Sequence, residues 1–222
     1  MIRNQALFLA AVFLLAACNT TTIPVAPVSV EGHSIISDSG MVVSAHPERS
    51  RIGIKILKKG GNAVDAAVAV EFALAVCYPE AGNIGGGGFM LVREADGRTD
   101  LIDYREKAPQ SSFAEMYLDA DGNVMDGLST DSHMASGVPG TVDGMLNIHS
   151  KYGNLSFREV IQPAIDLASN GFPVTSGQAD DLNNSRERFL KMNDTKVAFV
   201  RDIPWKNGDT LRQPDLARTL EL

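Results

Sequence analysis

One charged cluster has the residue types and the position to bind an anionic ligand. Arg105 lies in the run Asp103–Pro109, directly after a predicted strand. An arginine side chain presents a planar fork of N–H donors that matches the two oxygens of a carboxylate. Arg105 is therefore a candidate for binding a carboxylate. The same spacing allows an internal ion pair with Glu106 or Asp103 instead, and the residues alone favour neither interpretation.

A run of four glycines, Gly85–Gly88, lies just before the same predicted hairpin. The run lacks the Lys-Ser/Thr pair of a P-loop, and it follows a helix and opens a strand, which reverses the order of a dinucleotide-binding loop. Glycine permits close approach of another backbone or of a ligand. We therefore expect a steric role for these glycines and no nucleotide binding.

Other patterns for metal or nucleophilic chemistry are weak. The histidines, His33, His46, His133 and His149, show no metal-ligand spacing. The acidic run 119–123 lacks the glycine and glutamate positions of a calcium loop, so it predicts a plain turn. The sequence has no Gly-x-Ser-x-Gly elbow. We therefore expect no metal site.

A hairpin is expected to position both clusters. Residues 89–92 form a continuous apolar strand and residues 99–104 return as its partner, with Asp96-Gly97 as the turn. We expect this hairpin to be buried. The glycine run then lies just before it and Arg105 just after it.

Helical patterns account for most of the remaining chain. The clearest is 62–76, where Asn62 is a good N-cap, Asp65 suits the helix dipole, and an Ala- and Val-rich composition predicts packing on most sides. Pro163 predicts a kink or a restart in its helix, and Thr141 is a candidate cap. The expected elements are a strand within 33–44 and helices at 48–59, 62–76, 141–152, 156–171, 180–190 and from 214 to 222.

The N-terminus has the pattern of a targeting signal. Residues 1–17 contain a 12-residue apolar run from Ala6 to Ala17, which is too short to span a bilayer. The segment Leu15–Cys18 resembles a bacterial lipoprotein box, in which the cysteine is lipidated; a simple secretory signal is the alternative. We expect a signal peptide at 1–17, a flexible tether at 18–32 after lipidated Cys18, and a folded part at 33–222. Cys77 then has no partner and is expected to be buried.

Composition and charge limit the partners. The chain has 222 residues, 44% of them hydrophobic, so it can form a core. With 20 Lys and Arg against 27 Asp and Glu, its net charge is −7, which argues against nucleic-acid binding. An amphipathic pattern at 214–222 has no C-cap, so we expect the chain to be the front part of a longer protein.

Taken together, several motifs resemble the large subunit of γ-glutamyltranspeptidase (glutathione hydrolase). They occur in order and with matching spacing between Gly40 and Leu222. The motifs are Gly60–Ala69, Pro79–Phe89, Asp103–Pro109, Ser136–Val142, Lys151–Gly153, Gly208–Leu211 and Asp215–Ala217.

This resemblance implies a fold and a reaction. The fold is the α/β N-terminal nucleophile hydrolase fold, an αββα sandwich that is incomplete in this chain. A precursor cleaves itself into large and small subunits, which form a heterodimer. The new N-terminal Thr of the small subunit, which lies beyond residue 222, transfers the γ-glutamyl group of glutathione to water, amino acids or peptides. No cofactor is required, and Arg105 binds the substrate α-carboxylate.

The lipoprotein signal implies a bacterial periplasmic location, with the lipid on Cys18 anchoring the protein in the membrane. Asn19, in place of Asp, favours the outer membrane. Two other functions remain open. One is a cephalosporin (glutaryl) acylase of the same superfamily, and the other is a non-catalytic lipoprotein binding module. The motif around Arg105 favours glutathione over a glutaryl amide.

Overall fold

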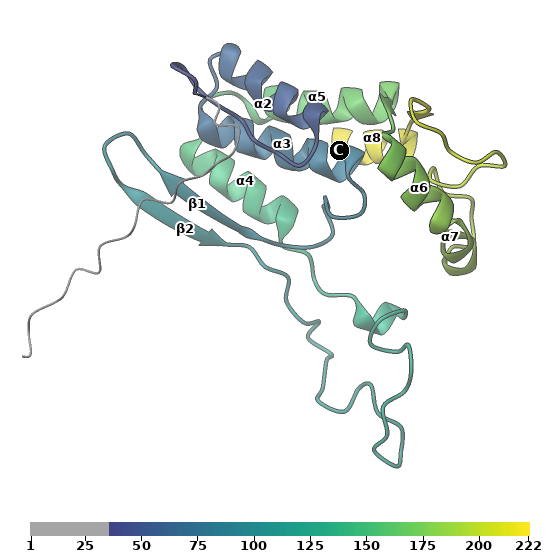
Figure 1. Ribbon diagram of the computed structural model, residues 1–222. Helices are drawn as coiled ribbons and strands as arrows, with labels where there is room; N and C mark the ends of the chain where they lie inside the picture. Colours follow the sequence, from purple (N-terminus) through teal and green to yellow (C-terminus); the bar gives the residue numbers. More distant parts are fainter. Residues whose placement is uncertain (1–35) are drawn as a thin grey trace, which may run out of the picture. The chain divides into compact units, whose positions relative to one another are not determined.

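The computed structural model describes residues 36–222, so the predictions for the signal peptide, the tether and Cys18 lie outside the described residues. Figure 1 shows the elements along the chain. The helices are α2 (Pro47–Lys58), α3 (Ala63–Cys77), the 3-10 turn η1 (His133–Ala135), α4 (Thr141–Tyr152), α5 (Phe157–Asn170), α6 (Ser176–Asn184), α7 (Arg186–Met192) and α8 (Pro214–Glu221). The strands are β1 (Phe89–Arg93), β2 (Thr99–Asp103), β3 (Phe172–Pro173) and β4 (Thr210–Leu211).

Helix α3 is the centre of the helical layer. It packs against α2, α4 and α5, and α5 in turn packs against α8. Small buried residues such as Val68, Ala69 and Ala73 permit this close packing on several sides. The predicted cap is confirmed, because the Asn62 side chain accepts hydrogen bonds from the amides of Val64 and Asp65.

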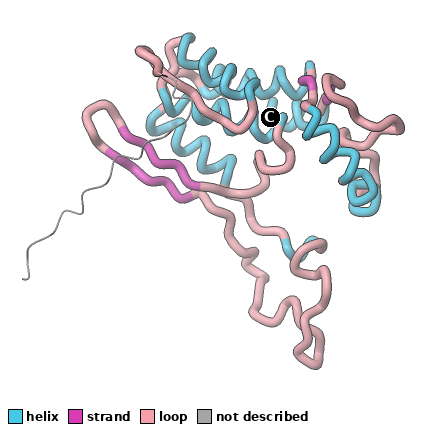
Figure 2. The backbone as a smooth tube through the Cα atoms, in the orientation of Figure 1, coloured by secondary structure: helices cyan, strands magenta, loops and turns pink. Residues whose placement is uncertain are grey.

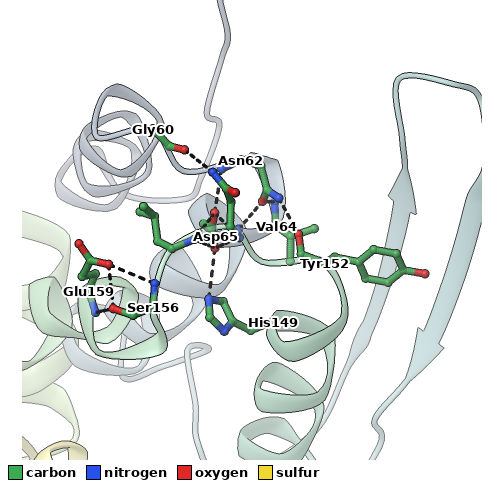
Figure 3. A network of polar contacts seen from close by, with 10 residues as sticks. Gly60, Asn62, Val64, Asp65, His149, Tyr152, Ser156 and Glu159 are labelled. Carbon is green, nitrogen blue, oxygen red and sulfur yellow. Dashed lines mark hydrogen bonds and ion pairs between the residues drawn. The ribbon is translucent and has the colours of Figure 1, made fainter.

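Asp65 does more than the predicted interaction with the helix dipole. Its side chain is fully buried and accepts hydrogen bonds from the amides of Asn62 at 2.8 Å and Asn154 at 3.1 Å. The Leu155 amide lies 3.4 Å away, and His149 Nε2 lies 3.2 Å from Oδ1 without forming a hydrogen bond to it. Figure 3 shows these groups around the carboxylate. Asp65 therefore ties the start of α3 to the connection between α4 and α5.

The predicted hairpin is present but is not buried on both faces. Strands β1 and β2 pair antiparallel, with Leu91 opposite Leu101, and Gly97 has a φ of 90° in the turn. Val92 is buried on the inner face. On the outer face, however, Phe89, Leu91 and Leu101 are 58%, 74% and 64% exposed, so the expected burial is wrong there. Described residues 36–222 place no second layer on that face.

Four other expectations need correction. No strand forms in described residues 36–44, because no neighbouring strand pairs with them. The expected helix at 180–190 is two helices, α6 and α7, which meet at Ser185. Pro163 lies inside one continuous helix, so there is no restart. Gly140, and not Thr141, is the N-cap of α4.

The prediction for Cys77 is confirmed. This free cysteine is fully buried, and its burial raises the pKa of the thiol. Arg49, which is also fully buried, donates from Nη2 to the Cys77 carbonyl oxygen at 2.9 Å. None of the helices in residues 36–222 is long and apolar enough to cross a membrane.

Candidate substrate-binding site

Arg105 lies two residues after the end of strand β2 and points its charge toward solvent. Its side chain is 59% exposed, and Nη2 lies 3.3 Å from Glu106 Oε1. The guanidinium carbon lies 5.9 Å from the centre of the Phe89 ring. One of the two ion pairs that the sequence left open is therefore present. It is an exposed pair, so most of the arginine fork remains accessible to a ligand.

The carboxylate of Glu106 is stabilised in its charged form. A hydrogen bond from its own backbone amide lowers its pKa, and Arg105 lowers it further. Glu106 therefore stays ionised near neutral pH and competes with any ligand carboxylate for Arg105. The competition is weak, because solvent and salt screen an exposed ion pair of this kind.

The glycine run packs directly under the Arg105 backbone. A Cβ at Gly87 would lie 2.5 Å from the Glu106 amide nitrogen and 2.6 Å from Arg105 Cα. A Cβ at Gly88 would meet the Tyr104 ring at 2.9 Å. Such distances leave no room for any side chain at Gly87. The expected steric role is therefore confirmed, and the partner is another backbone.

A second close contact lies at the N-terminus of α4. A Cβ at Gly140 would lie 2.0 Å from the Tyr104 carbonyl oxygen and 3.0 Å from that of Arg105. Lys107 and Val138 exchange two backbone hydrogen bonds, of 3.1 and 2.7 Å. Residues 104–107 therefore run between the glycine run and the segment that leads into α4. Figure 2 shows the long loop that leaves the hairpin here and returns to α4.

The histidines and the acidic turn supply no further site. His46 and His149 are both buried, and residues 36–222 contain no group of three metal-ligating side chains. His33 lies outside the described residues. At 119–123 the structure has a plain turn, as predicted, in which the Asp119 carbonyl oxygen accepts from the Gly122 amide at 3.1 Å.

Comparison with known proteins places this arrangement in a family. The family model described as Gamma-glutamyltranspeptidase matches residues 49–222. The chain belongs to the gamma-glutamyltranspeptidase family. It is 50% identical over 188 residues to the glutathione hydrolase proenzyme of Pseudomonas sp. strain A14, which covers 84% of this chain and 33% of that protein. The corresponding proenzyme of Escherichia coli K12 is 47% identical over 192 residues, covering 86% of this chain and 33% of that protein.

A solved structure supports the same assignment. The crystal structure of Helicobacter pylori gamma-glutamyltranspeptidase is 46% identical and superimposes with a TM-score of 0.81. The match covers 85% of this chain and 55% of that one. The chain thus has part of the N-terminal nucleophile hydrolase fold, as the resemblance implied. It spans about a third of the length of the curated relatives.

Two glycine substitutions test the packing of the glycine run. We expect Gly87→Ala to lower the free energy of unfolding by about 1–3 kcal/mol, because the added methyl overlaps backbone atoms that cannot move independently. Gly85→Ala is the matched control, since a Cβ there meets nothing within 4 Å. Urea unfolding of the two variants gives the comparison. Equal losses would show that the close contact at Gly87 is unimportant.

Proposed function

We propose that this chain is the front, large-subunit part of a γ-glutamyltransferase and glutathione hydrolase. The whole enzyme transfers the γ-glutamyl group of glutathione to water, amino acids or peptides. A threonine outside these 222 residues forms the γ-glutamyl ester. The observation that carries this proposal is the exposed Arg105 fork, fixed at the hairpin exit in a chain of this family.

In this proposal Arg105 binds the α-carboxylate of the substrate, which is not a reacting group. Its guanidinium offers two parallel N–H donors to one carboxylate, so it sets both the position and the orientation of the γ-glutamyl group. The γ-carbonyl carbon is thereby held where the threonine hydroxyl can attack it. Binding energy from the non-reacting α-carboxylate is thereby used to orient the carbonyl, which lowers the activation free energy of the attack.

The threonine chemistry is assigned to the rest of the protein. The α-amine of the N-terminal threonine takes the hydroxyl proton, and the hydroxyl oxygen attacks the γ-carbonyl. The C–N bond breaks, and cysteinylglycine leaves as its amine takes the proton. Water or an acceptor amine then attacks the γ-glutamyl ester, which releases the threonine hydroxyl.

The outer face of the hairpin supports a second subunit as partner. Phe89, Leu91 and Leu101 form an exposed apolar face on a two-stranded sheet. A two-stranded hairpin is marginally stable without a layer that covers it. We assign this face to the small subunit cut from the same precursor, which would supply the neighbouring β layer.

The activity is tested by co-expressing this chain with the downstream part of its precursor. We expect self-cleavage into two subunits and release of the chromophoric amine from a γ-glutamyl anilide. Replacing the threonine at the new N-terminus should abolish both. If the assembled protein cleaves itself but releases no amine from any γ-glutamyl compound, the proposed reaction is wrong.

A glutaryl acylase is the second candidate and differs in the substrate head group. A glutaryl amide lacks the α-amine and the α-carboxylate, so Arg105 would have no partner on it. Comparing glutathione with a glutaryl amide therefore separates the two functions. A non-catalytic binding module predicts instead that residues 18–222 alone unfold cooperatively and bind a ligand; the exposed hairpin face argues against that function.

We further propose a periplasmic location with a lipid anchor on Cys18, favouring the outer membrane. Support comes from the lipoprotein-box pattern Leu15–Cys18 alone. Several acyl chains on one cysteine anchor a protein stably, at about 0.8 kcal/mol per buried methylene. Metabolic labelling with a palmitate analogue should mark the wild type and not Cys18→Ser. Equal labelling of both proteins would exclude this anchor.

A further inference from the structure

A buried polar link joins the loop before the glycine run to the start of α4. The Thr141 hydroxyl, in a residue that is 1% exposed, donates to Asn83 Oδ1 at 3.1 Å. The same Oδ1 accepts from the Gly86 amide at 2.7 Å. The Gly86 carbonyl oxygen in turn accepts from the amides of Gly140 at 2.8 Å and Thr141 at 3.1 Å. Two segments that are 58 residues apart in the sequence are thus held together.

These bonds hold in place two segments that both pack against the backbone around Arg105. Gly87 packs against this backbone next to Arg105 Cα, and Gly140 packs against it next to the carbonyl oxygens of Tyr104 and Arg105. The Tyr104 amide also donates to the Gly88 carbonyl oxygen at 3.0 Å. A shift of the Gly87 segment or of the Gly140 segment would therefore move the backbone that carries the Arg105 guanidinium.

We propose that Asn83 and Thr141 are positioning residues for Arg105, and this proposal rests on the proposed function. Among residues 36–222, neither side chain hydrogen-bonds to the guanidinium, so they act through the backbone segments of Gly87 and Gly140. Gly140 is the N-cap of α4 and has no side chain to accept from the helix amides. The Gly86 carbonyl oxygen instead accepts from the amides of Gly140 and Thr141. The Thr141 hydroxyl is therefore free to bond Asn83 and orient its amide oxygen toward Gly86.

The test uses the assembled two-subunit enzyme and a γ-glutamyl anilide. We expect Thr141→Val, which removes the hydroxyl at nearly constant volume, to raise KM about fivefold, the effect of one buried hydrogen bond, with a smaller change in kcat. Thr141→Ser keeps the hydroxyl and should restore the wild-type KM. Thr219→Val is the matched control, since its hydroxyl is exposed on α8 and bonds only the Asp215 carbonyl oxygen. If Thr141→Val does not accumulate, Thr141→Ala replaces it.

A double-mutant cycle shows whether the link acts through Arg105. In the Arg105→Ala background we expect Thr141→Val to leave KM unchanged, because no fork remains to be positioned. An equal fivefold rise in both backgrounds would overturn the proposal, as would a loss of thermal stability without any change in KM. If Arg105→Ala itself leaves KM unchanged, the role of Arg105 fails first, which separates the two proposals.

Discussion

On the proposed function, replacing Arg105 by alanine in the assembled enzyme is expected to raise KM for a γ-glutamyl anilide strongly, lowering kcat/KM about 100-fold. This factor corresponds to about 3 kcal/mol, the scale of a charge-assisted, bidentate contact with a carboxylate. Turnover should fall less than binding, because the proposed partner of Arg105, the α-carboxylate, does not react, although lost orientation of the carbonyl also contributes. Steady-state kinetics of the purified heterodimer gives both parameters.

Two companion variants show whether charge or geometry matters at this position. Arg105→Lys keeps the charge but loses the fork, so we expect an intermediate KM. Arg98→Ala is the matched control, because Arg98 is another exposed arginine of the same hairpin and pairs with Glu94 and Asp96 at the turn. It should leave KM unchanged. A wild-type KM in Arg105→Ala would refute the assigned role.

Local signals in the sequence were sufficient to place the elements around this site. Asn62 and the Ala- and Val-rich residues after it define α3, and Asp96-Gly97 defines the hairpin turn. Arg105 was singled out because it combines a charge with a place directly after a strand. The alternative interpretation, an ion pair between Arg105 and Glu106, is also present in the structure. Each of these features depends on residues that lie close together in the chain.

Several expectations that the structure corrects share a different cause, which is contact between residues far apart in the sequence. Thr141 looked like a helix cap, but its hydroxyl bonds Asn83, 58 residues earlier. The hairpin looked buried because its residues are apolar, yet the layer that would cover its outer face is not among residues 36–222. The glycine run indicated close packing without revealing that Arg105 Cα is the partner. The sequence pattern alone does not identify which distant residue makes such a contact.

Asp65 is the clearest example of a role that the sequence understated, and it leads to the second large prediction. Asp65→Ala should lower the free energy of unfolding by about 3–5 kcal/mol, because it removes a fully buried carboxylate that accepts hydrogen bonds from three backbone amides. The amides of Asn62, Asn154 and Leu155 would all lose their bond to the carboxylate, and the His149 ring would lose the carboxylate beside it. Urea unfolding of the assembled enzyme measures the loss.

Asp143 provides the control that separates this network from the helix dipole. It is also an aspartate in the first turn of a helix, α4, but its side chain is exposed. Asp143→Ala removes the same favourable charge at a helix N-terminus and should cost about 0.3–1 kcal/mol. A loss in Asp65→Ala no larger than in Asp143→Ala would mean that the dipole alone explains Asp65. A loss several times larger would show that Asp65 stabilises the fold by joining the start of α3 to the chain between α4 and α5.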